Sequence, residues 1–138
     1  IPMAAVVVAT FVATTVEFSE TGQDKHILIQ VGGNWCVWCY RFHDFVEGDS
    51  SLSALSEAEY VSVHVNYSRE NMNEEWLAKW GYPQRFGFPV FVVLDAEGQR
   101  LHTQNSAYLE SDKSYDPKAV EAFFKHWTPA ALLPENYE

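Results

Sequence analysis

Apolar positions along the chain follow two spacings, one typical of buried strands and one typical of helices. Short runs of adjacent apolar or β-branched residues predict strands, whereas apolar residues that recur every three or four positions predict amphipathic helices. The predicted strands are 27–31, 60–65, 89–94 and 99–103. Four helices are predicted: one that follows Cys36, one over 51–59, one over 70–80 and one that begins at Pro117. Strands that alternate with helices in this way predict an α/β domain.

The helix that begins at Pro117 has the clearest local signals. Asp116 is a preferred N-cap residue, and proline suits the first helical position. One stripe of the helix is apolar and comprises Val120, Phe123, Phe124 and Trp127. We expect this stripe to pack on the sheet, and residues 128–138 to form a peripheral tail.

The two cysteines of the chain, Cys36 and Cys39, lie where a strand gives way to a helix. Unpaired N–H groups and the helix dipole stabilise a thiolate in the first turn of a helix, so the thiol pKa falls below its usual value of ~8.5. We therefore predict that Cys36 is the attacking cysteine, and that it is the more exposed and more acidic of the two. Cys39, one turn later, is predicted to be shielded and to resolve the mixed disulfide.

Other uses of the cysteine pair are possible from the sequence. A structural disulfide usually closes a longer loop, because the entropy that it removes from the unfolded chain grows with loop length. A structural zinc site needs about four ligands, and the nearby residue of a suitable type is His43. A binding module that keeps the fold without catalysis, or a metal-binding use of the pair, is the alternative to redox chemistry.

Two segments resemble the thioredoxin superfamily, in particular the thiol–disulfide oxidoreductases and isomerases of bacterial envelopes. The first segment is 26–46, which holds the motif W-C-x-x-C, and the second is 86–101, which holds Phe88-Pro89 before a strand and a turn. The resemblance implies a three-layer sandwich with a central mixed sheet and helices on both faces. It also implies a cis proline at Pro89 opposite the cysteines, and contacts to substrate from Trp35, Phe88 and Pro89.

The function that the resemblance implies is disulfide exchange with protein thiols or disulfides, catalysed by Cys36 and Cys39. An unidentified redox partner would restore the pair, and we expect no cofactor. The direction of the reaction (reduction, oxidation or isomerisation) stays open, because it depends on the reduction potential. The family resemblance favours a periplasmic or secreted location, with the cytoplasm as the alternative.

Gln30 departs from the pattern of this superfamily. Many thioredoxins carry an aspartate at the corresponding position, behind the cysteine pair, where it is proposed to help remove the proton of the resolving thiol. Gln30 cannot ionise. The sequence therefore leaves open how Cys39 loses its proton.

Length and charge limit the other possibilities. The 138 residues suit one domain, and the net charge of −10 argues against binding to nucleic acid or insertion into an anionic membrane. The apolar stretch 1–16 is shorter than the ~20 residues that span a bilayer. We expect residues 1–25 to form an N-terminal extension or an edge element, with the apolar part of a secretion signal as the alternative for this stretch.

Overall fold

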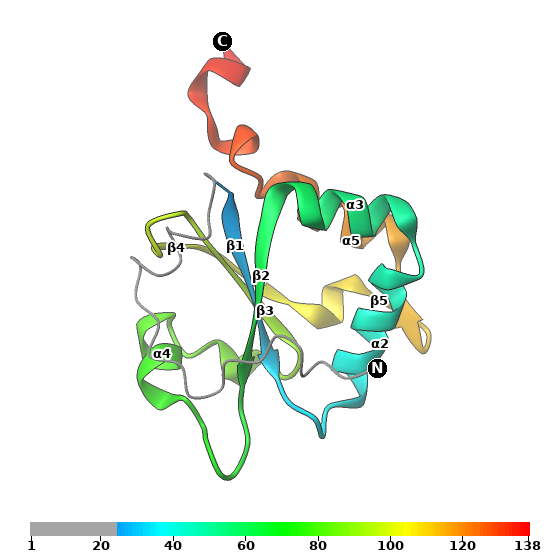
Figure 1. The fold of residues 1–138 in the computed structure, drawn as a ribbon, viewed down its shortest axis with the longest axis vertical. Helices are drawn as coiled ribbons and strands as arrows, with labels where there is room; N and C mark the ends of the chain where they lie inside the picture. The colour runs from blue at the N-terminus through cyan, green and yellow to red at the C-terminus, as the bar shows by residue number, and fades with distance from the viewer. Residues whose placement is uncertain (1–24) are drawn as a thin grey trace.

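The computed structural model describes residues 25–138, which build a four-stranded mixed sheet between two layers of helices (Figure 1). The strands lie in the order β2-β1-β3-β4. Their bounds are β1 (His26–Gly32), β2 (Tyr60–Asn66), β3 (Val90–Leu94) and β4 (Arg100–Asn105). β1 pairs in parallel with β2, whereas the pairs β1–β3 and β3–β4 are antiparallel. The predicted three-layer sandwich is confirmed, and the prediction for the N-terminal stretch lies outside the described residues.

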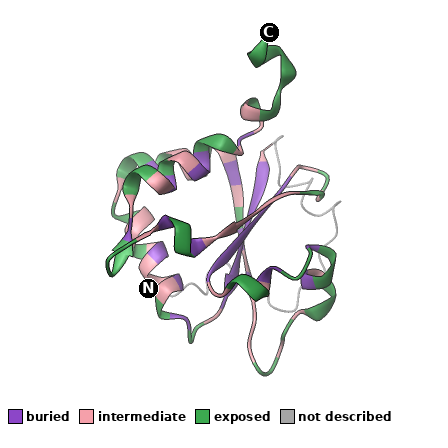
Figure 2. Cartoon of the chain, turned by 180° about the vertical axis from the view of Figure 1, so that it is seen from behind, coloured by how far each residue is buried: buried purple, intermediate pink, exposed green. Residues whose placement is uncertain are grey.

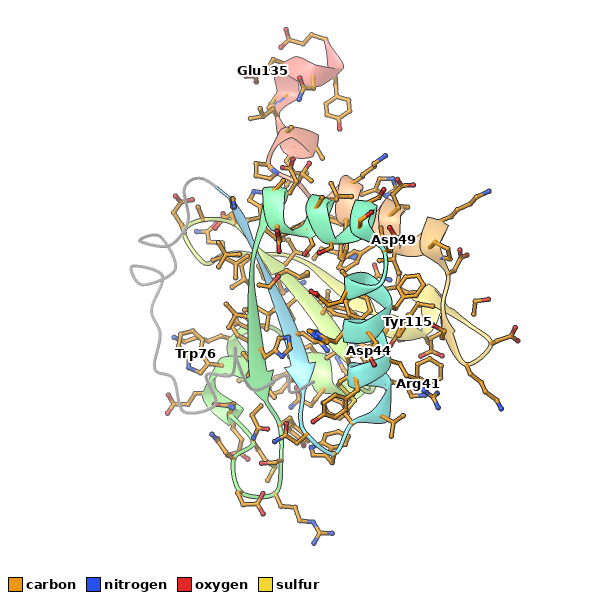
Figure 3. All side chains as sticks on the ribbon, turned by 45° about the vertical axis from the view of Figure 1, so that its right-hand side comes forward. Arg41, Asp44, Asp49, Trp76, Tyr115 and Glu135 are labelled. Carbon is orange, nitrogen blue, oxygen red and sulfur yellow. A yellow bond between two sulfur atoms is a disulfide. The ribbon has the colours of Figure 1, made fainter. Side chains whose placement is uncertain are left out.

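The two faces of the sheet are covered unequally. Three helices, α2 (Val37–Glu47), α3 (Ser50–Glu59) and α5 (Pro117–His126), lie on one side of the sheet, and α4 (Glu74–Lys79) lies on the other (Figure 1). In the stick view, Tyr115 and Arg41 are on the three-helix side and Trp76 is on the α4 side (Figure 3). The cluster under α4 is mostly aliphatic, whereas the cluster under the three helices contains several aromatic rings.

β1 is a central strand of the sheet, and all seven of its residues are buried (Figure 2). Ile27, Ile29 and Val31 belong to the cluster under α4, and Leu28 belongs to the cluster on the opposite face. Side chains of a strand alternate between faces, so a central strand covered on both sides needs apolar residues at adjacent positions. The apolar run in the sequence is therefore explained by the burial of β1 on both faces of the sheet.

α5 has the predicted start and the predicted apolar side. The Asp116 side chain accepts a hydrogen bond from the Lys118 backbone N–H at 3.0 Å, as an N-cap residue does. Val120, Phe123 and Phe124 are buried against the sheet. After α5 the chain forms two short 3₁₀ turns, η4 (Ala130–Leu132) and η5 (Pro134–Tyr137), and extends away from the sheet (Figure 1).

The helix predicted over 70–80 is too long, because only Glu74–Lys79 is α-helical. Asn73 has a left-handed backbone, and side chains of the preceding loop take the hydrogen bonds that a helix would make. Ser68 Oγ accepts from the Asn71 N–H, and the Asn73 amide donates to the Asn66 carbonyl oxygen. Loop 67–73 is therefore a separate structured segment.

Smaller differences concern the ends of elements. Asp49 accepts hydrogen bonds from the N–H groups of Ser51 and Leu52, so α3 begins at Ser50, one residue before the start of the predicted helix 51–59. The remaining short elements are η2 (Pro83–Phe86), η3 (Ser106–Leu109), β5 (Glu110–Ser111) and β6 (Ser114–Tyr115). Among residues 25–138, no helix has the length and apolar character needed to cross a bilayer.

Candidate active site

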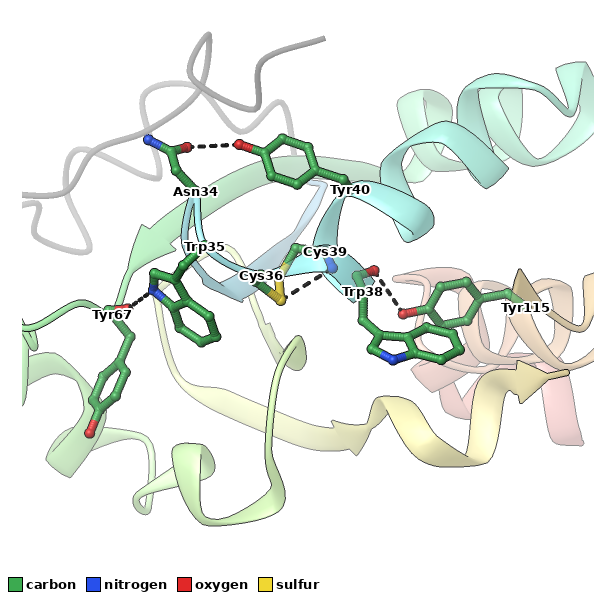
Figure 4. Close-up of a disulfide and its surroundings, with 8 residues drawn as sticks. All are labelled: Asn34, Trp35, Cys36, Trp38, Cys39, Tyr40, Tyr67 and Tyr115. Atoms are coloured by element: carbon green, nitrogen blue, oxygen red, sulfur yellow. Dashed lines mark hydrogen bonds between the residues drawn. A yellow bond between two sulfur atoms is a disulfide. The ribbon is translucent and has the colours of Figure 1, made fainter. Parts of the chain in front are cut away.

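The cysteine pair lies at the start of α2 and forms a disulfide (Figure 4). Cys36 is the N-cap residue, its N–H donates to the Gly33 carbonyl at 3.0 Å, and its sulfur accepts from the Cys39 N–H at 3.2 Å. The sulfur of Cys36 therefore occupies the position that a capping oxygen usually takes, facing the unpaired N–H groups of the first turn. This geometry would stabilise a thiolate on Cys36 after reduction.

Both cysteines are buried in the disulfide form. The exposed fraction is 4% for Cys36 and 0% for Cys39. Cys36 is thus the more exposed of the two, as predicted, but the difference is small. The flanking residues Trp35 and Val37 are exposed, so the surface around Cys36 is accessible although the sulfur is covered.

Gly32, the last residue of β1, is the backbone against which the disulfide packs. A Cβ atom at Gly32 would overlap the Cys39 sulfur and would lie 3.8 Å from the Cys36 sulfur. A side chain at this position would therefore displace the disulfide. At Gly33, a Cβ atom would instead meet the Trp35 indole nitrogen at 2.6 Å. The two glycines thus make room for two different parts of the site.

Pro89 and Phe88 come to the cysteines through pairing between β1 and β3. Val90, the residue after Pro89, pairs with Val31, so the start of β3 lies beside the end of β1 and the disulfide. The Phe88–Pro89 peptide bond is cis. Phe88 packs directly against the two cysteines.

Aromatic rings connect the disulfide to a neighbouring groove. Phe88 makes an edge contact with Trp35 at a centroid distance of 5.2 Å and stacks on Tyr67 at 5.0 Å. The Trp35 indole N–H donates to the Tyr67 carbonyl oxygen at 2.8 Å (Figure 4). These contacts join the cysteine loop, loop 67–73 and the segment before β3 into one surface.

The groove beside Trp35 has a volume of about 510 Å³ and a mainly apolar lining. Its lining residues are Trp35, Tyr67, Ser68, Arg69, Glu70 and Met72. Trp35 is 53% exposed and Met72 is also exposed, so large apolar groups border the approach to the disulfide. Exposed apolar groups that gather in one hollow indicate a binding surface.

On the other side of the disulfide, Trp38 of α2 contacts Tyr115 of β6. The Tyr115 hydroxyl donates to the Trp38 carbonyl oxygen at 3.0 Å, and the Trp38 ring makes an edge contact with the Tyr115 ring (Figure 4). Burial raises the pKa of Tyr115 above its usual value, with a smaller contribution from Glu110, so its hydroxyl keeps the donated proton. The Arg41 guanidinium lies 4.7 Å from the centroid of the Trp38 ring. These contacts hold the first turn of α2 in place.

Three buried side-chain atoms among the described residues have no hydrogen-bond partner, namely Gln30 Nε2, His64 Nδ1 and Gln84 Oε1. Gln30 and His64 are register partners in β1 and β2. Burial, with a smaller effect from His43, lowers the pKa of His64 to about 4. At neutral pH the His64 ring is therefore uncharged. The residues 25–138 contain no group of three or more histidine, cysteine, aspartate or glutamate side chains placed to hold a metal ion.

A family model for the thioredoxin-like domain matches residues 14–114. The chain belongs to this thioredoxin-like family. Among curated relatives, the disulfide bond reductase DsbH of Chlamydia pneumoniae is 27% identical over 97 residues. That match covers 64% of this chain but only 57% of the relative, so the chain spans little more than half of the relative's length.

Solved structures show the same thioredoxin-like fold. A disulphide isomerase from Xylella fastidiosa Temecula1 superposes with a TM-score of 0.65 at 22% identity, covering 81% of this chain and 83% of the other. A structure described as DsbH oxidoreductase has a TM-score of 0.58 at 21% identity, covering 96% and 92% of the two chains. At these identities the likeness establishes the fold alone.

The structure brings together all five residues that the sequence singled out in this thioredoxin-like chain. They are Cys36, Cys39, Trp35, Phe88 and Pro89. Sequence reasoning missed Gly32 and Tyr67 as parts of the site. The glycine pair before Trp35 was a usable signal for the first, since a glycine can mark a close approach to another group. Tyr67 had no local signal, because its role depends on contact with Phe88.

Proposed function

We propose that this chain is a thiol–disulfide oxidoreductase that exchanges disulfides with protein substrates through Cys36 and Cys39. The observation that carries the proposal is the disulfide between Cys36 and Cys39 at the start of α2. A pair separated by two residues constrains the unfolded chain little, so stability does not account for it. Redox exchange accounts for the pair, and the similarity to the disulfide bond reductase of Chlamydia pneumoniae supports the same activity.

In the reducing direction, the Cys36 thiolate attacks one sulfur of a substrate disulfide. The substrate S–S bond breaks, the other substrate sulfur leaves as a thiolate, and Cys36 is joined to the substrate in a mixed disulfide. The Cys39 thiolate then attacks the Cys36 sulfur, which closes the internal disulfide and releases the second substrate thiolate. A dithiol partner returns the pair to its reduced form, and the oxidising direction follows the same steps in reverse.

Substrate binding is assigned to Trp35, Phe88 and Pro89. Phe88 packs on both cysteines and Trp35 lies beside it, so a substrate segment that reaches Cys36 would pass over these side chains. The backbone of Phe88 can pair with an extended segment as the edge of a sheet does. The adjoining groove would accept an apolar side chain of the same segment, because its lining is mainly apolar.

The location and the domain organisation are also proposals. Disulfides persist in oxidising environments such as the bacterial periplasm, so a periplasmic or secreted location suits this chemistry. We propose a single domain, with residues 1–25 as an extension or edge element. Support comes from the single four-stranded sheet to which the helices of both layers contribute their apolar sides.

Reduction of insulin in the presence of dithiothreitol tests the proposed activity. Cys36→Ala should abolish turnover, whereas Cys39→Ala should accumulate mixed disulfides that a thiol wash releases. Alkylation of the reduced protein at mildly acidic pH should modify Cys36 before Cys39. Normal turnover by Cys39→Ala would exclude the two-cysteine mechanism. Equilibration with glutathione then gives the reduction potential and with it the direction.

A further inference from the structure

A second hollow lies between η2 and β4 and is distinct from the groove beside Trp35. Its volume is about 320 Å³. η2 contributes Arg85 and Phe86 to its lining, and β4 contributes Arg100 and Thr103. None of the residues that line this η2–β4 pocket also lines the groove. The pocket is therefore a separate surface whose use the disulfide chemistry does not explain.

The lining of the η2–β4 pocket is basic in a chain that is strongly acidic. The sequence has 19 acidic and 9 basic residues, yet the described residues that line the pocket include two arginines and a histidine and no aspartate or glutamate. Within residues 25–138, neither Arg85 nor Arg100 forms an ion pair. Both guanidinium groups are therefore available to an anion from another molecule.

Contacts within the pocket restrain both arginine side chains. The Arg85 guanidinium carbon lies 4.1 Å from the centroid of the Phe86 ring, a distance at which a cation is attracted to an aromatic face. The Arg100 guanidinium lies 3.5 Å from the Thr103 hydroxyl oxygen. Its Nε is 4.0 Å from the position that a Cβ atom would take at Gly81. Binding of an anion should therefore cost less side-chain entropy than it would with two unrestrained arginines.

The backbone around the pocket favours a carboxylate over a phosphate. Phosphate sites commonly use free backbone N–H groups, but the N–H groups of Gly81, Tyr82 and Gly87 donate to carbonyl oxygens of their own segment. Trp80 and Gly81 line the pocket, so the C-terminal end of α4, with its partial negative charge, adjoins it. A singly charged, planar carboxylate matches guanidinium groups and is repelled less by this helix end than a doubly charged phosphate.

The position of the pocket favours a carboxylate that a protein partner carries. Phe86 lines the pocket, and one residue separates it from Phe88, so their Cα atoms are at most ~7 Å apart. Phe88 packs on both cysteines. A partner segment bound at Cys36 can thus place a neighbouring acidic side chain in the pocket. Apolar lining from Trp80 and Leu101 would contact the methylene groups of that side chain.

We propose that the η2–β4 pocket binds an aspartate or glutamate side chain of the protein that exchanges disulfides with Cys36. This inference rests on the proposed oxidoreductase function and names a class of partner, namely proteins with an acidic residue close to the reacting cysteine. Arg85 and Arg100 hold the carboxylate, while the cysteine pair carries out the exchange. Because the net charge of −10 repels acidic partners elsewhere, the pocket selects the position of the acidic residue as well as its charge.

Side-chain signals of the arginines test binding without any redox step. The probe is a cysteine-free peptide in which two glutamates lie among serine and glycine residues, and the control peptide carries glutamine instead. In the oxidised full chain with nitrogen-labelled arginine, the glutamate peptide should shift the Nε–H signals of Arg85 and Arg100. The signal of Arg41, which lies on the three-helix side of the sheet (Figure 3), should stay the same. The glutamine peptide should shift none of the three signals.

Two outcomes of this titration would overturn the inference. The first is an absence of shifts for Arg85 and Arg100 at millimolar glutamate peptide. The second is tighter binding of inorganic phosphate or of free glutarate than of the glutamate peptide, because it would assign the pocket to a small anion and not to a protein segment. Neither outcome depends on a variant that must fold.

Exchange kinetics test whether the pocket serves the proposed reaction. The reduced full chain is mixed with a peptide disulfide that carries glutamate a few residues from its cysteine, or with the matched glutamine peptide. Combined Arg85→Gln and Arg100→Gln should lower the second-order rate constant for the glutamate peptide about tenfold at low salt, about threefold for each exposed charge. The rate constant for the glutamine peptide should stay unchanged.

The matched control is combined Lys113→Gln and Lys118→Gln, which removes two exposed positive charges in the β5–β6 turn and in α5. It should change the rate constant for the glutamate peptide by less than about twofold. Equal wild-type rates for the two peptides, or an equal loss in the two double variants, would overturn the inference and leave the proposed function standing. Exchange with neither peptide, with the arginine shifts intact, would overturn the function and keep only the carboxylate site.

Discussion

Buried polar side chains are hydrogen-bonded at one end of β1 and lack partners at the other. At the start of the strand, His26 Nδ1 lies 2.8 Å from the Trp127 carbonyl oxygen, and Tyr60, the register partner of His26, donates its hydroxyl to the Phe124 carbonyl oxygen at 2.6 Å. Both carbonyls belong to the C-terminal end of α5, whose last carbonyls have no partner within the helix. Side chains at the start of β1 and β2 therefore contact carbonyl groups at the C-terminal end of α5 that the helix leaves unpaired.

At the other end of β1, polar atoms are buried and unpaired. Gln30 and His64 have no partner for Nε2 and Nδ1, and Gly32 offers no side chain to fill the space that the Cys39 sulfur takes. The paired groups at the start of β1 favour stability, because an unpaired buried polar group costs free energy. The unpaired arrangement is expected where chemistry, rather than stability alone, selects the residues.

The largest expected effect is that of Gly32→Ala. The added methyl would overlap the Cys39 sulfur, and it should destabilise the disulfide form by about 3 kcal/mol, near the upper end for overpacking. The reduced form, whose thiols can rotate, should suffer less. The reduction potential should therefore rise by up to about 60 mV, as measured by equilibration with glutathione.

Gly33→Ala is the matched control for that variant. Its methyl would meet the Trp35 indole rather than a sulfur atom, so the potential should change little while protein substrates bind less well. An equal change of potential in both variants would contradict the close packing of Gly32 and the disulfide.

The next effect is a loss of stability at acid pH through His64. Burial, and to a lesser extent His43, lowers the pKa of His64 from 6.5 to about 4 in the folded protein. Between these values the unfolded chain binds a proton that the folded chain does not, so the free energy of unfolding falls as the pH falls from 6.5 towards 4. We expect a contribution of about 2 kcal/mol, reduced from the full shift by partial exposure.

Urea unfolding of the wild type and of His64→Gln at several pH values measures this contribution. The stability difference between pH 6.5 and pH 4 should be smaller in the variant by the stated amount. Parallel pH profiles for the two proteins would show that His64 is not responsible.

A smaller loss is expected from Tyr60→Phe at the start of the sheet. The variant removes the buried hydrogen bond to the Phe124 carbonyl and leaves that oxygen unpaired, which should cost about 1–2 kcal/mol. Burial raises the pKa of Tyr60 above its usual value, so the hydroxyl remains a donor at neutral pH. Thermal unfolding measures the loss, and the reduction potential should stay at its wild-type value. A shifted potential would mean that the two ends are coupled.

The smallest effect on stability is expected from Gln30→Met. Because the Gln30 amide has an unpaired nitrogen, an apolar side chain of similar shape should leave the free energy of unfolding unchanged or raise it slightly. Urea unfolding of the oxidised protein is the measurement. A loss of more than about 1 kcal/mol would show that Gln30 contributes to stability as His26 and Tyr60 do.

Local patterns were sufficient for most elements and failed in one loop. The run of apolar residues in β1 and the Asp116-Pro117 start of α5 are signals contained within a few residues. Loop 67–73 carries helix-like spacing in part, but hydrogen bonds from Ser68 and Asn73 side chains stabilise a different backbone. The segment predicted wrongly is also the segment that lines the groove beside Trp35.

The sequence by itself determined the strand and helix pattern, the C-x-x-C pair at a helix start and the family, because each depends on neighbours along the chain. Only the tertiary structure decided which distant residues meet. Pairing of β1 with β2 puts His64 beside Gln30, and the ring of Phe88 stacks on that of Tyr67. Strand register sets the first of these contacts, and register follows from how both faces of the sheet are buried. Burial on that scale is a property of the whole fold and of no single segment.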